Sequence, residues 1–472
     1  MKSRTRLLCL AVLCALLMSM SAAPAQAAES LNLTRLLTGI GQLTPVNGTR
    51  FLLAKEMGGE NWGLYNTSGV QLIPYAYKDF SYLSYNCFQA GEYAKPKLAA
   101  EDPYPALEQI NCHALVTPGG TAVSEFIYGT VNVYNPFWAS GWVLEEADGA
   151  DYDYKLDNAH FYRIARCDLF FLGDGLQEAK QILSLTREQF RDAAGHGHYL
   201  SVQDRGGAVS VWDANGEKLP LAPGSLKDSV YAIKNWMLYD CAQNKMISDG
   251  YAAVKEVYYE DGMLLVASRT DFSGKQWNAV FNEYGEEIMP LQNAKADVIG
   301  NYVLLTHNET GKKGLYSLSW RSMLLYCAYD EIFQNNKAID PFISFGYAGV
   351  VLDGVRATID MNTGFVTPVK KLETEVTFLG SVCYYTVEKK ALSTYTYLYA
   401  PDGTEKRVTG EAKAGRGSGL VTAGEFLEGK DVFTCYGQRL LKQFTAKAII
   451  ITDDDKVILN TRNNGFELYS LQ

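Results

Sequence analysis

The chain has 472 residues and a formal net charge of −10, with 43 Lys and Arg against 53 Asp and Glu. A chain this acidic is repelled by phosphate backbones and anionic lipid surfaces, and no basic stripe offsets the charge, so we expect no nucleic-acid partner. Length alone would suggest about three domains. Tandem repeats override that expectation, because stacked copies can form a single domain.

The N-terminal segment 1–27 predicts a cleaved export signal. A basic start over 2–6 precedes an apolar stretch over 7–17 that is too short to span a bilayer, and small residues follow at 25–27. We therefore expect residues 28–472 to form a mature chain that is secreted or associated with the cell surface. No later stretch of the sequence is long and apolar enough to predict a transmembrane helix.

A recurring cassette is clearest over residues 62–80. A short apolar strand leads into a polar turn closed by Gly69, and a second apolar strand contains Pro74. Alternating apolar and polar positions predict half-buried strands, and Asn or Asp followed by Gly predicts a turn with positive φ. One such hairpin cannot bury its apolar face alone, so the copies must stack on one another.

Further copies follow along the chain, with looser ones at 113–120 and 237–247. The residues that define the repeats are Trp62, Gly63, Tyr65, Gly69, Pro74, Trp212, Gly216, Pro220, Trp277, Gly285, Pro290, Gly314, Tyr316, Gly364 and Gly403. Two hairpins in roughly 35 to 55 residues is the spacing of a propeller blade. The prediction is a single all-β domain over 28–472, a β-propeller built of tandem β-hairpin repeats, with an open β-hairpin solenoid as the alternative.

The cassette over 62–80 resembles the WG (or KWG) repeat of bacterial proteins, in which Trp-Gly precedes an apolar pair, Asp or Asn, Gly, two apolar residues, Pro and Tyr-Asp. The segment 313–332 resembles a second member without the Trp, and 277–290 a third in which Asn278 replaces the Gly. The resemblance implies a β-rich scaffold used in binding. It implies no shared catalytic residues.

Helical signal is confined to two places. Thr186 as an N-cap, Gln189 three residues on and Gly195 as a stop predict a short helical insertion near 176–194. A shorter helical piece is predicted over Leu31–Leu37. Loops rich in Pro and charge, or in Gly, are expected at 94–106 and 409–419.

Cysteines are scattered singly through the chain. Those after residue 27 are Cys87, Cys112, Cys167, Cys241, Cys327, Cys383 and Cys435. The absence of any CxxC pair excludes a zinc ribbon or a thioredoxin-like motif. Their apolar contexts favour small buried side chains over a disulfide framework; Cys87 with Cys112 is the pair to test first.

Histidines and a serine offer weak signals of chemistry. His196-Gly197-His198 with His160 has the residue types of a metal site, but a loop with two exposed histidines is the simpler interpretation. His113 has no evident partner in the sequence. Ser418 lies in a Gly-rich loop without the first Gly of GxSxG, which argues against a catalytic serine.

An acidic run at Asp148, Asp151, Asp153 and Asp157 contains ligand types that calcium prefers. Leu156 stands where an EF-hand loop beginning at Asp151 would need Gly, which favours a solvated acidic loop. A second acidic run, 453–455, fits a hairpin turn between two apolar strands.

These observations predict a secreted, non-catalytic β-repeat scaffold that engages an extracellular protein or a surface polymer. No catalytic, metal or ligand-binding residue is assigned, and no cofactor is expected, with calcium the one candidate left open. The alternative is a glycan-binding or glycan-active β-propeller, with aromatic side chains as sugar platforms. A structural wall-associated protein is a third interpretation.

Overall fold

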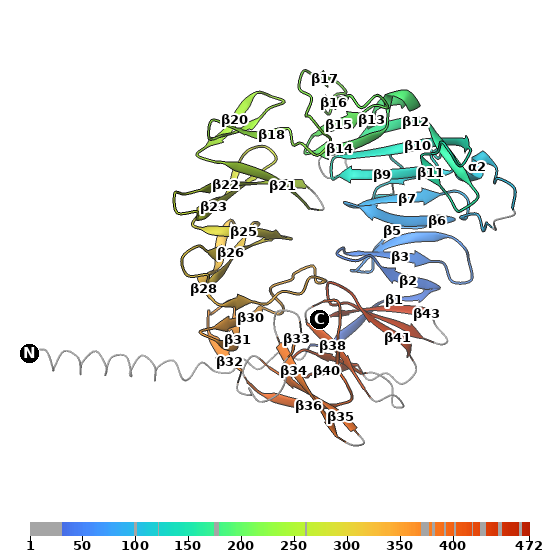
Figure 1. Ribbon diagram of the computed structural model, residues 1–472. Helices are drawn as coiled ribbons and strands as arrows, with labels where there is room; N and C mark the ends of the chain where they lie inside the picture. Colours follow the sequence, from blue (N-terminus) through green and yellow to red (C-terminus); the bar gives the residue numbers. More distant parts are fainter. Residues whose placement is uncertain are drawn as a thin grey trace, which may run out of the picture.

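Figure 1 shows the computed structural model as a succession of small antiparallel sheets arranged around a ring. It describes residues 31–98, 102–120, 122–173, 179–259, 262–369, 377–379, 383–390, 393–400, 403–417, 419–424, 431–441, 446–461 and 465–472. The export signal predicted for 1–27 lies outside these residues. Among them, no helix is long and apolar enough to cross a membrane.

The described strands form eleven sheets, and within most of them strand order follows the sequence. The first half of the ring contains β2 (Gln42–Pro45), β3 (Phe51–Lys55), β4 (Trp62–Asn66) and β5 (Gln71–Tyr77); β6 (Asp79–Ser84), β7 (Cys87–Gly91) and β8 (His113–Val116); β9 (Thr130–Asn135), β10 (Trp138–Ala147), β11 (Tyr154–Lys155), β12 (Phe161–Phe171) and β13 (Lys180–Thr186); β14 (Asp192–His196), β15 (Tyr199–Gln203), β16 (Val209–Trp212) and β17 (Lys218–Leu219); and β18 (Tyr231–Lys234), β19 (Met237–Asp240) and β20 (Lys245–Asp249).

The second half continues the same plan. It contains β21 (Ala253–Tyr259), β22 (Gly262–Thr270), β23 (Gln276–Asn282) and β24 (Glu287–Gln292); β25 (Ala294–Ile299), β26 (Tyr302–His307), β27 (Lys313–Ser317) and β28 (Ser322–Tyr329); β29 (Glu331–Ile332), β30 (Tyr347–Leu352), β31 (Val355–Asp360) and β32 (Val366–Pro368); β33 (Thr377–Leu379), β34 (Cys383–Lys390), β35 (Ser393–Tyr399) and β36 (Glu405–Thr409); and β37 (Lys413–Ala414), β38 (Leu420–Ala423), β39 (Asp431–Thr434) and β40 (Arg439–Leu441). Described helix is limited to α2 (Leu107–Ile110) and the 3-10 turn η2 (Arg187–Gln189).

The ring is closed by strands from the two ends of the described chain. β1 (Leu33–Ile40) pairs antiparallel with β43 (Gly465–Leu471), in a sheet that β42 (Val457–Thr461) and β41 (Ala446–Ile451) complete. An open solenoid would leave its first and last repeats apart with free edges. The pairing therefore confirms the propeller prediction and rejects the solenoid.

The acidic segment 453–455 forms the predicted hairpin turn between β41 and β42, and it also reinforces closure. The backbone N–H of Gly48 donates to Asp453 Oδ2 (2.5 Å), and Thr67 Oγ1 donates to Asp454 Oδ2 (2.6 Å). The N–H of Gly419 donates to the Asp455 carboxylate (3.1 Å), and that of Ile339 donates to Asp453 O (2.9 Å). One turn thus joins the closing sheet to three others.

Buried apolar clusters hold neighbouring sheets face to face. Leu43 and Leu52 of the β2–β5 sheet pack with Ile458 and Leu468 of the closing sheet. The largest cluster is continuous from β10 to β23 and includes Trp138, which is fully buried. Each interface removes apolar surface that a single sheet would leave in water, which is why the repeats must stack.

The cassette spans the third and fourth strands of a sheet and enters the first strand of the next. In residues 62–80 these are β4, β5 and the start of β6. The Asn66 side chain closes the turn, because its Oδ1 accepts from the N–H of Ser68 (3.1 Å) and Val70 (2.9 Å) while Gly69 has φ +84°. Asn282 and Asp213 make the same bonds in later copies.

Gly63 of the cassette is needed because the backbone of the neighbouring strand approaches it closely. Between the pairs Trp62↔Tyr77 and Leu64↔Ile73 the fourth strand has extra residues, and it bulges toward Gly63. A Cβ at Gly63 would lie 2.6 Å from Ile73 O. Gly314 stands at the same place in the β25–β28 sheet, where a Cβ would lie 2.8 Å from Leu325 O.

The register corrects the assignment of the copy at 277–290. Val280 pairs with Met289 and Phe281 with Glu287, as Leu64 pairs with Ile73 and Tyr65 with Gln71. Ala279 therefore takes the position of Gly63, and Asn278 takes that of Trp62. Sequence spacing placed Asn278 at the Gly position because Trp277 precedes it by one residue.

The helical insertion near 176–194 is largely wrong. Residues 174–178 lie outside the described chain, Lys180–Thr186 is strand β13 paired with β12, and Gly195 lies in β14 opposite Leu200. The capping box between Thr186 and Gln189 does form, but it starts a single 3-10 turn. An unpaired edge of β12 offers hydrogen bonds to the flanking residues, and this tertiary pairing overrides the local signal. The helical piece at Leu31–Leu37 is also wrong, since β1 begins there.

The described parts of the predicted loops, 94–98, 102–106, 410–417 and 419, are irregular except for the short strand β37, and Thr409 still belongs to β36. Six cysteines are described as free thiols, and Cys87, Cys112, Cys167 and Cys435 are buried. This confirms the interpretation of small buried side chains for those four. Cys87 and Cys112 are not bonded to each other, and the side chain of Cys383 lies outside the described part.

Candidate functional site

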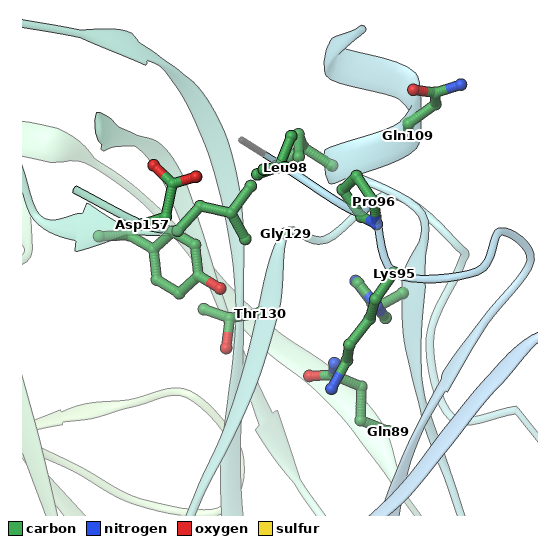
Figure 2. A pocket seen from close by; sticks show the side chains of 12 residues that line it. Gln89, Lys95, Pro96, Leu98, Gln109, Gly129, Thr130 and Asp157 are labelled. Carbon is green, nitrogen blue, oxygen red and sulfur yellow. The ribbon is translucent and has the colours of Figure 1, made fainter. Parts of the chain in front are cut away.

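A pocket lies between the β6–β8 sheet and the β9–β13 sheet, in a stretch where long connections interrupt the repeats. Its volume is about 400 Å³, and its walls come from β7, β8, α2, the loop before α2 and the loop after β11. Figure 2 shows Lys95 and Asp157 on different sides of the space, with Pro96 on the side of Lys95 and Leu98 between the two sides.

A charged group forms the wall on the β6–β8 side. Asp79, Gly91 and His113 lie in one row across β6, β7 and β8. Because Gly91 has no side chain, the other two meet over the middle strand, and His113 donates from Nε2 to Asp79 Oδ2 (3.3 Å). Lys95 Nζ lies 3.6 Å from the same carboxylate oxygen. His113 was expected to have no partner, so this contact corrects that expectation.

His113 is positively charged at neutral pH. Burial opposes its charge, but the hydrogen bonds with Asp79 and Cys112 raise the pKa of His113 to about 9. Its Nδ1 lies 3.3 Å from the backbone oxygen of Tyr128, so both ring nitrogens donate a hydrogen bond. Burial also acts on Asp79, but its bonds to His113 and Lys95 hold the pKa of that carboxyl below its ordinary value.

The described parts of the connection between β7 and β8, residues 92–98 and 102–112, line one side of the pocket and are anchored to the neighbouring sheet. Asn111 Nδ2 donates to Leu144 O (2.8 Å) and Asn111 Oδ1 accepts from the Leu144 N–H (2.9 Å), so α2 is clamped to β10. Farther along, Tyr104 OH donates to Ala147 O (3.2 Å). Ile110, at the end of α2, is buried and also lines the pocket.

His160 ties this segment to the opposite wall. Its Nδ1 donates to Asp157 Oδ1 (2.8 Å), and its Nε2 donates to Asp102 O (3.2 Å). The bond with Asp157 is the main reason that the pKa of His160 is raised. His160 is therefore fully engaged, and it does not join His196 in a metal site.

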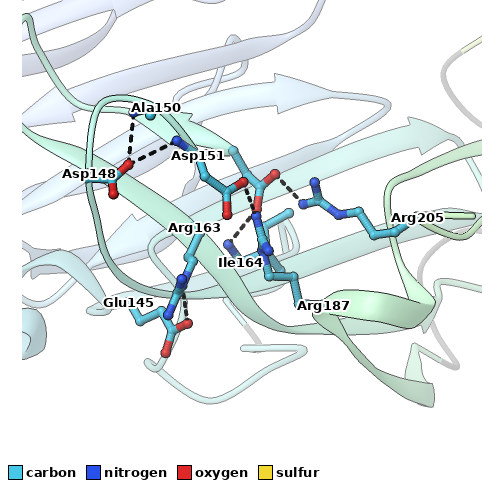
Figure 3. A network of polar contacts seen from close by, with 9 residues as sticks. Glu145, Asp148, Ala150, Asp151, Arg163, Ile164, Arg187 and Arg205 are labelled. Carbon is cyan, nitrogen blue, oxygen red and sulfur yellow. Dashed lines mark hydrogen bonds and ion pairs between the residues drawn. The ribbon is translucent and has the colours of Figure 1, made fainter.

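The acidic run at 148–157 forms a paired network, shown in Figure 3. Arg205 and Arg187 both pair with Asp153, and Arg187 Nη2 also donates to Asp151 Oδ1 (2.5 Å). Asp153 further accepts from the Ile164 N–H (3.0 Å), and its side chain is only 12% exposed. Burial works against its charge, but the bond from Arg205 leads the contacts that lower the pKa of Asp153.

The expectation of a solvated acidic loop is therefore wrong for Asp153. Asp148 instead accepts from the N–H groups of Ala150 (2.9 Å) and Asp151 (3.1 Å) and shapes the turn. Two arginines pair with Asp151 and Asp153, two of the four carboxylates in the proposed calcium set. The network fixes the loop that carries Tyr154, Leu156 and Asp157 into the pocket wall.

A second polar cluster draws residues from several sheets but is closed. Both carboxylate oxygens of Glu256 accept hydrogen bonds, from Ser229 and from Tyr258. His196 Nδ1 lies 3.6 Å from Glu256, and the side chains of the two residues are 6% and 8% exposed. The loop with two exposed histidines is thus wrong, because His196 ends β14 and is buried. The cluster joins β14 to β21 and offers no open surface at these side chains.

Exposed aromatic side chains gather at turns between third and fourth strands. Tyr284 follows β23, Trp320 follows β27 and Phe365 follows β31, with exposed fractions of 57%, 74% and 57%. In antiparallel sheets of the same strand order these turns lie on one face. Arg321 Nη1 donates to Glu286 Oε1 (2.6 Å), so the first two turns are neighbours. We call Tyr284, Trp320 and Phe365 the aromatic turn face.

The repeat-defining residues lie in the strands and turns of the sheets, and of the pocket residues the sequence singled out only His113 and Asp157. Trp62, Gly63 and Tyr65 lie in β4 and Pro74 in β5, away from the pocket, and Ser418 lies outside the described residues. Asp157 was noticed only as a calcium ligand. The usable signal was the long connection after β7, since loops that interrupt a regular repeat often carry function.

No family model and no curated protein matches the chain. Solved structures that match include a eukaryotic initiation factor, at 11% identity over 78% of this chain and 87% of that chain, with a TM-score of 0.26. BamB from Moraxella catarrhalis matches at 11% over 70% and 96%, with a TM-score of 0.19. TolB from Acinetobacter baumannii matches at 11% over 81% and 80%, with a TM-score of 0.16. At these scores the matches add nothing to the sheet order, on which the fold assignment rests.

Proposed function

We propose that the chain is an exported, non-catalytic β-propeller scaffold of the WG-repeat type that binds an extracellular protein or a surface polymer. The aromatic turn face carries the proposal. Large aromatic side chains on turns are mostly exposed here, although their burial would be favourable by about 1.5–3 kcal/mol each. Exposed aromatic groups at this density favour an interaction surface.

Polar contacts around the face support binding over catalysis. The pair Arg321–Glu286 joins the two turns that carry Tyr284 and Trp320, and both of its side chains are about half exposed. It offers hydrogen-bond donors and acceptors beside two flat rings. The one buried cluster of His, Glu and Tyr described above has its carboxylate engaged by protein donors, so it is not poised to act on a substrate.

The test is a binding screen of residues 28–472 against extracts of extracellular and cell-surface proteins and against glycan arrays. The double variant Tyr284→Ala/Trp320→Ala should lose the signal. The control Phe272→Ala/Tyr326→Ala removes two aromatic residues that are more exposed, at 113% and 77%, from other parts of the surface. Equal loss in both variants, or no saturable binding by the parent chain, contradicts the proposal.

A glycan ligand is the second candidate. An exposed Trp and an exposed Tyr on two turns that an Arg–Glu pair joins have the flat apolar surfaces and polar groups that a sugar ring needs. Saturable binding on the glycan array that depends on Trp320, without capture of any protein, would favour this candidate over the protein partner.

Export is tested separately. Expression of the full chain with a C-terminal tag should give a processed product outside the cytoplasm whose N-terminus is residue 28. A product that keeps residues 1–27 and stays inside the cell contradicts export.

A further inference from the structure

We propose that the pocket between the β6–β8 and β9–β13 sheets binds a small organic monoanion. Its carboxylate pairs with Lys95, beside the positively charged His113, and its apolar body lies against Leu98, Ile110 and Leu156. This inference is independent of the aromatic turn face, because none of these residues lies at the turns that form it.

The charges on the β6–β8 side of the pocket favour an anionic ligand. Asp79 is a single negative group between two positive ones, His113 at 3.3 Å and Lys95 at 3.6 Å, so this wall has one positive charge in excess. The Lys95 side chain is 67% exposed, while those of Asp79 and His113 are 15% and 12% exposed. Because an exposed ion pair contributes little, Lys95 can turn from Asp79 to a ligand at small cost.

The opposite wall limits the charge of the ligand. Asp157 faces the pocket, and its ion pair with His160 (2.8 Å) leaves that wall close to neutral. A dianion such as a phosphate ester would place its second charge near Asp79 and Asp157, where it is repelled. One negative charge matches the one positive charge in excess.

Size and lining define the rest of the ligand. A volume of about 400 Å³ lies within the range of pockets for small organic ligands, roughly 300–1,000 Å³. Pro96, Leu98, Ile110 and Leu156 give apolar surface, and Figure 2 shows Leu98 and Pro96 near the middle of the lining. Thr130 and Gln109 add neutral polar groups that orient a ligand without adding charge.

The experiment uses three probes of nearly the same shape: 4-phenylbutyrate, 4-phenylbutanamide and 4-phenylbutylamine. Isothermal titration calorimetry on residues 28–472 at pH 7 should show 1:1 binding of the carboxylate. The neutral amide should bind roughly tenfold more weakly, a difference of ~1.4 kcal/mol, and the amine should not bind measurably.

Matched variants locate the site. Lys95→Gln should weaken carboxylate binding roughly tenfold, whereas Lys97→Gln, an exposed lysine two residues away that does not line the pocket, should leave it unchanged. Leu98→Ala should weaken the carboxylate and the amide alike, because both share the phenyl body. Circular dichroism confirms that the three variants are folded.

A pH series gives a further readout. Carboxylate binding should hold from pH 6 to 8 and fall above about pH 9, as His113 loses its proton next to Asp79, Lys95 and Cys112. Amide binding should not follow this profile. Equal binding of all three probes, no binding of any of them, or equal losses in Lys95→Gln and Lys97→Gln would overturn the proposal.

Discussion

The β2–β5 sheet and the neighbouring β6–β8 and β9–β13 sheets differ in how closely they keep the repeat. In the first, short turns join four strands, and the cassette residues are consumed by strand pairing and by the bulge at Gly63. In the second region, a long connection separates β7 from β8, and β12 is paired on both of its edges before β13 ends the sheet. The pocket lies where the repeat is interrupted.

A repeat fold can acquire a ligand pocket where an insertion interrupts the repeat. A regular copy leaves few polar side chains free, because Asn66 closes a turn and the apolar residues fill the interfaces between sheets. An insertion adds side chains that the ring does not need. Lys95, Gln109 and Asp157 come from such connections, so they can face a ligand without weakening a sheet.

The largest expected effect lies in the regular region. Gly63→Ala places a Cβ 2.6 Å from Ile73 O, and backbone cannot yield cheaply, so the free energy of unfolding should fall by about 3 kcal/mol. In Gly119→Ala the new Cβ would contact only Thr117 Oγ1, at 4.0 Å, so the free energy of unfolding should change by less than about 0.5 kcal/mol. Urea denaturation of both variants measures the difference. Similar losses at the two glycines would contradict the close approach at the bulge.

The ion-pair network should come next. Arg205→Ala leaves Asp153, which is mostly buried, with fewer charged partners and should cost about 2 kcal/mol. Arg163→Ala breaks a pair with Glu145 in which both side chains are more than 40% exposed, and should cost less than about 0.5 kcal/mol. Denaturation midpoints test the ranking. Faster limited proteolysis within 148–160 in Arg205→Ala alone would show that the network holds the pocket wall.

The His113–Asp79 pair should give a smaller, pH-dependent effect. The pKa of His113 is raised from 6.5 to about 9, so its stabilisation is complete below pH 6.5 and is lost as the pH rises through about 9. The stabilisation that comes from the Asp79 carboxylate is present above about pH 4 and is lost on further acidification, because the pKa of Asp79 is lowered in the folded chain. Relative to His113→Gln, the parent chain should be more stable at pH 6, and this advantage should shrink as the pH rises from 6.5 through about 9. A difference that does not vary with pH would argue for packing alone.

The smallest effect on stability belongs to the aromatic turn face. Trp320→Ala removes a side chain that is 74% exposed, so the free energy of unfolding should change by less than about 0.5 kcal/mol. Partner binding should nevertheless fall. A large loss of stability would mean that Trp320 stabilises the ring. Trp320 would then be a scaffold residue and not a residue of the interaction surface.

Much of the scaffold could be read from the sequence because its signals are local. Alternation of apolar residues and the Asn-to-Gly turns depend on neighbours within a few positions, and Gly69, Gly285 and Gly403 have the positive φ that those turns need. The helix near 176–194 failed for the opposite reason. Thr186 and Gln189 gave a correct cap, but the exposed edge of β12 decided the conformation of the residues before it.

The sequence by itself determined that the chain is built of β-hairpins that must stack, since period-two patterns and turn residues act over short distances. Only the tertiary structure decided that the ring closes through β1 and β43, which are separated by most of the chain. It alone brought Asp79 to His113 across Gly91 and set Arg205 on Asp153, because strand register and loop packing join residues that no spacing connects. The pocket arises from those long-range contacts, and its chemistry became visible only with them.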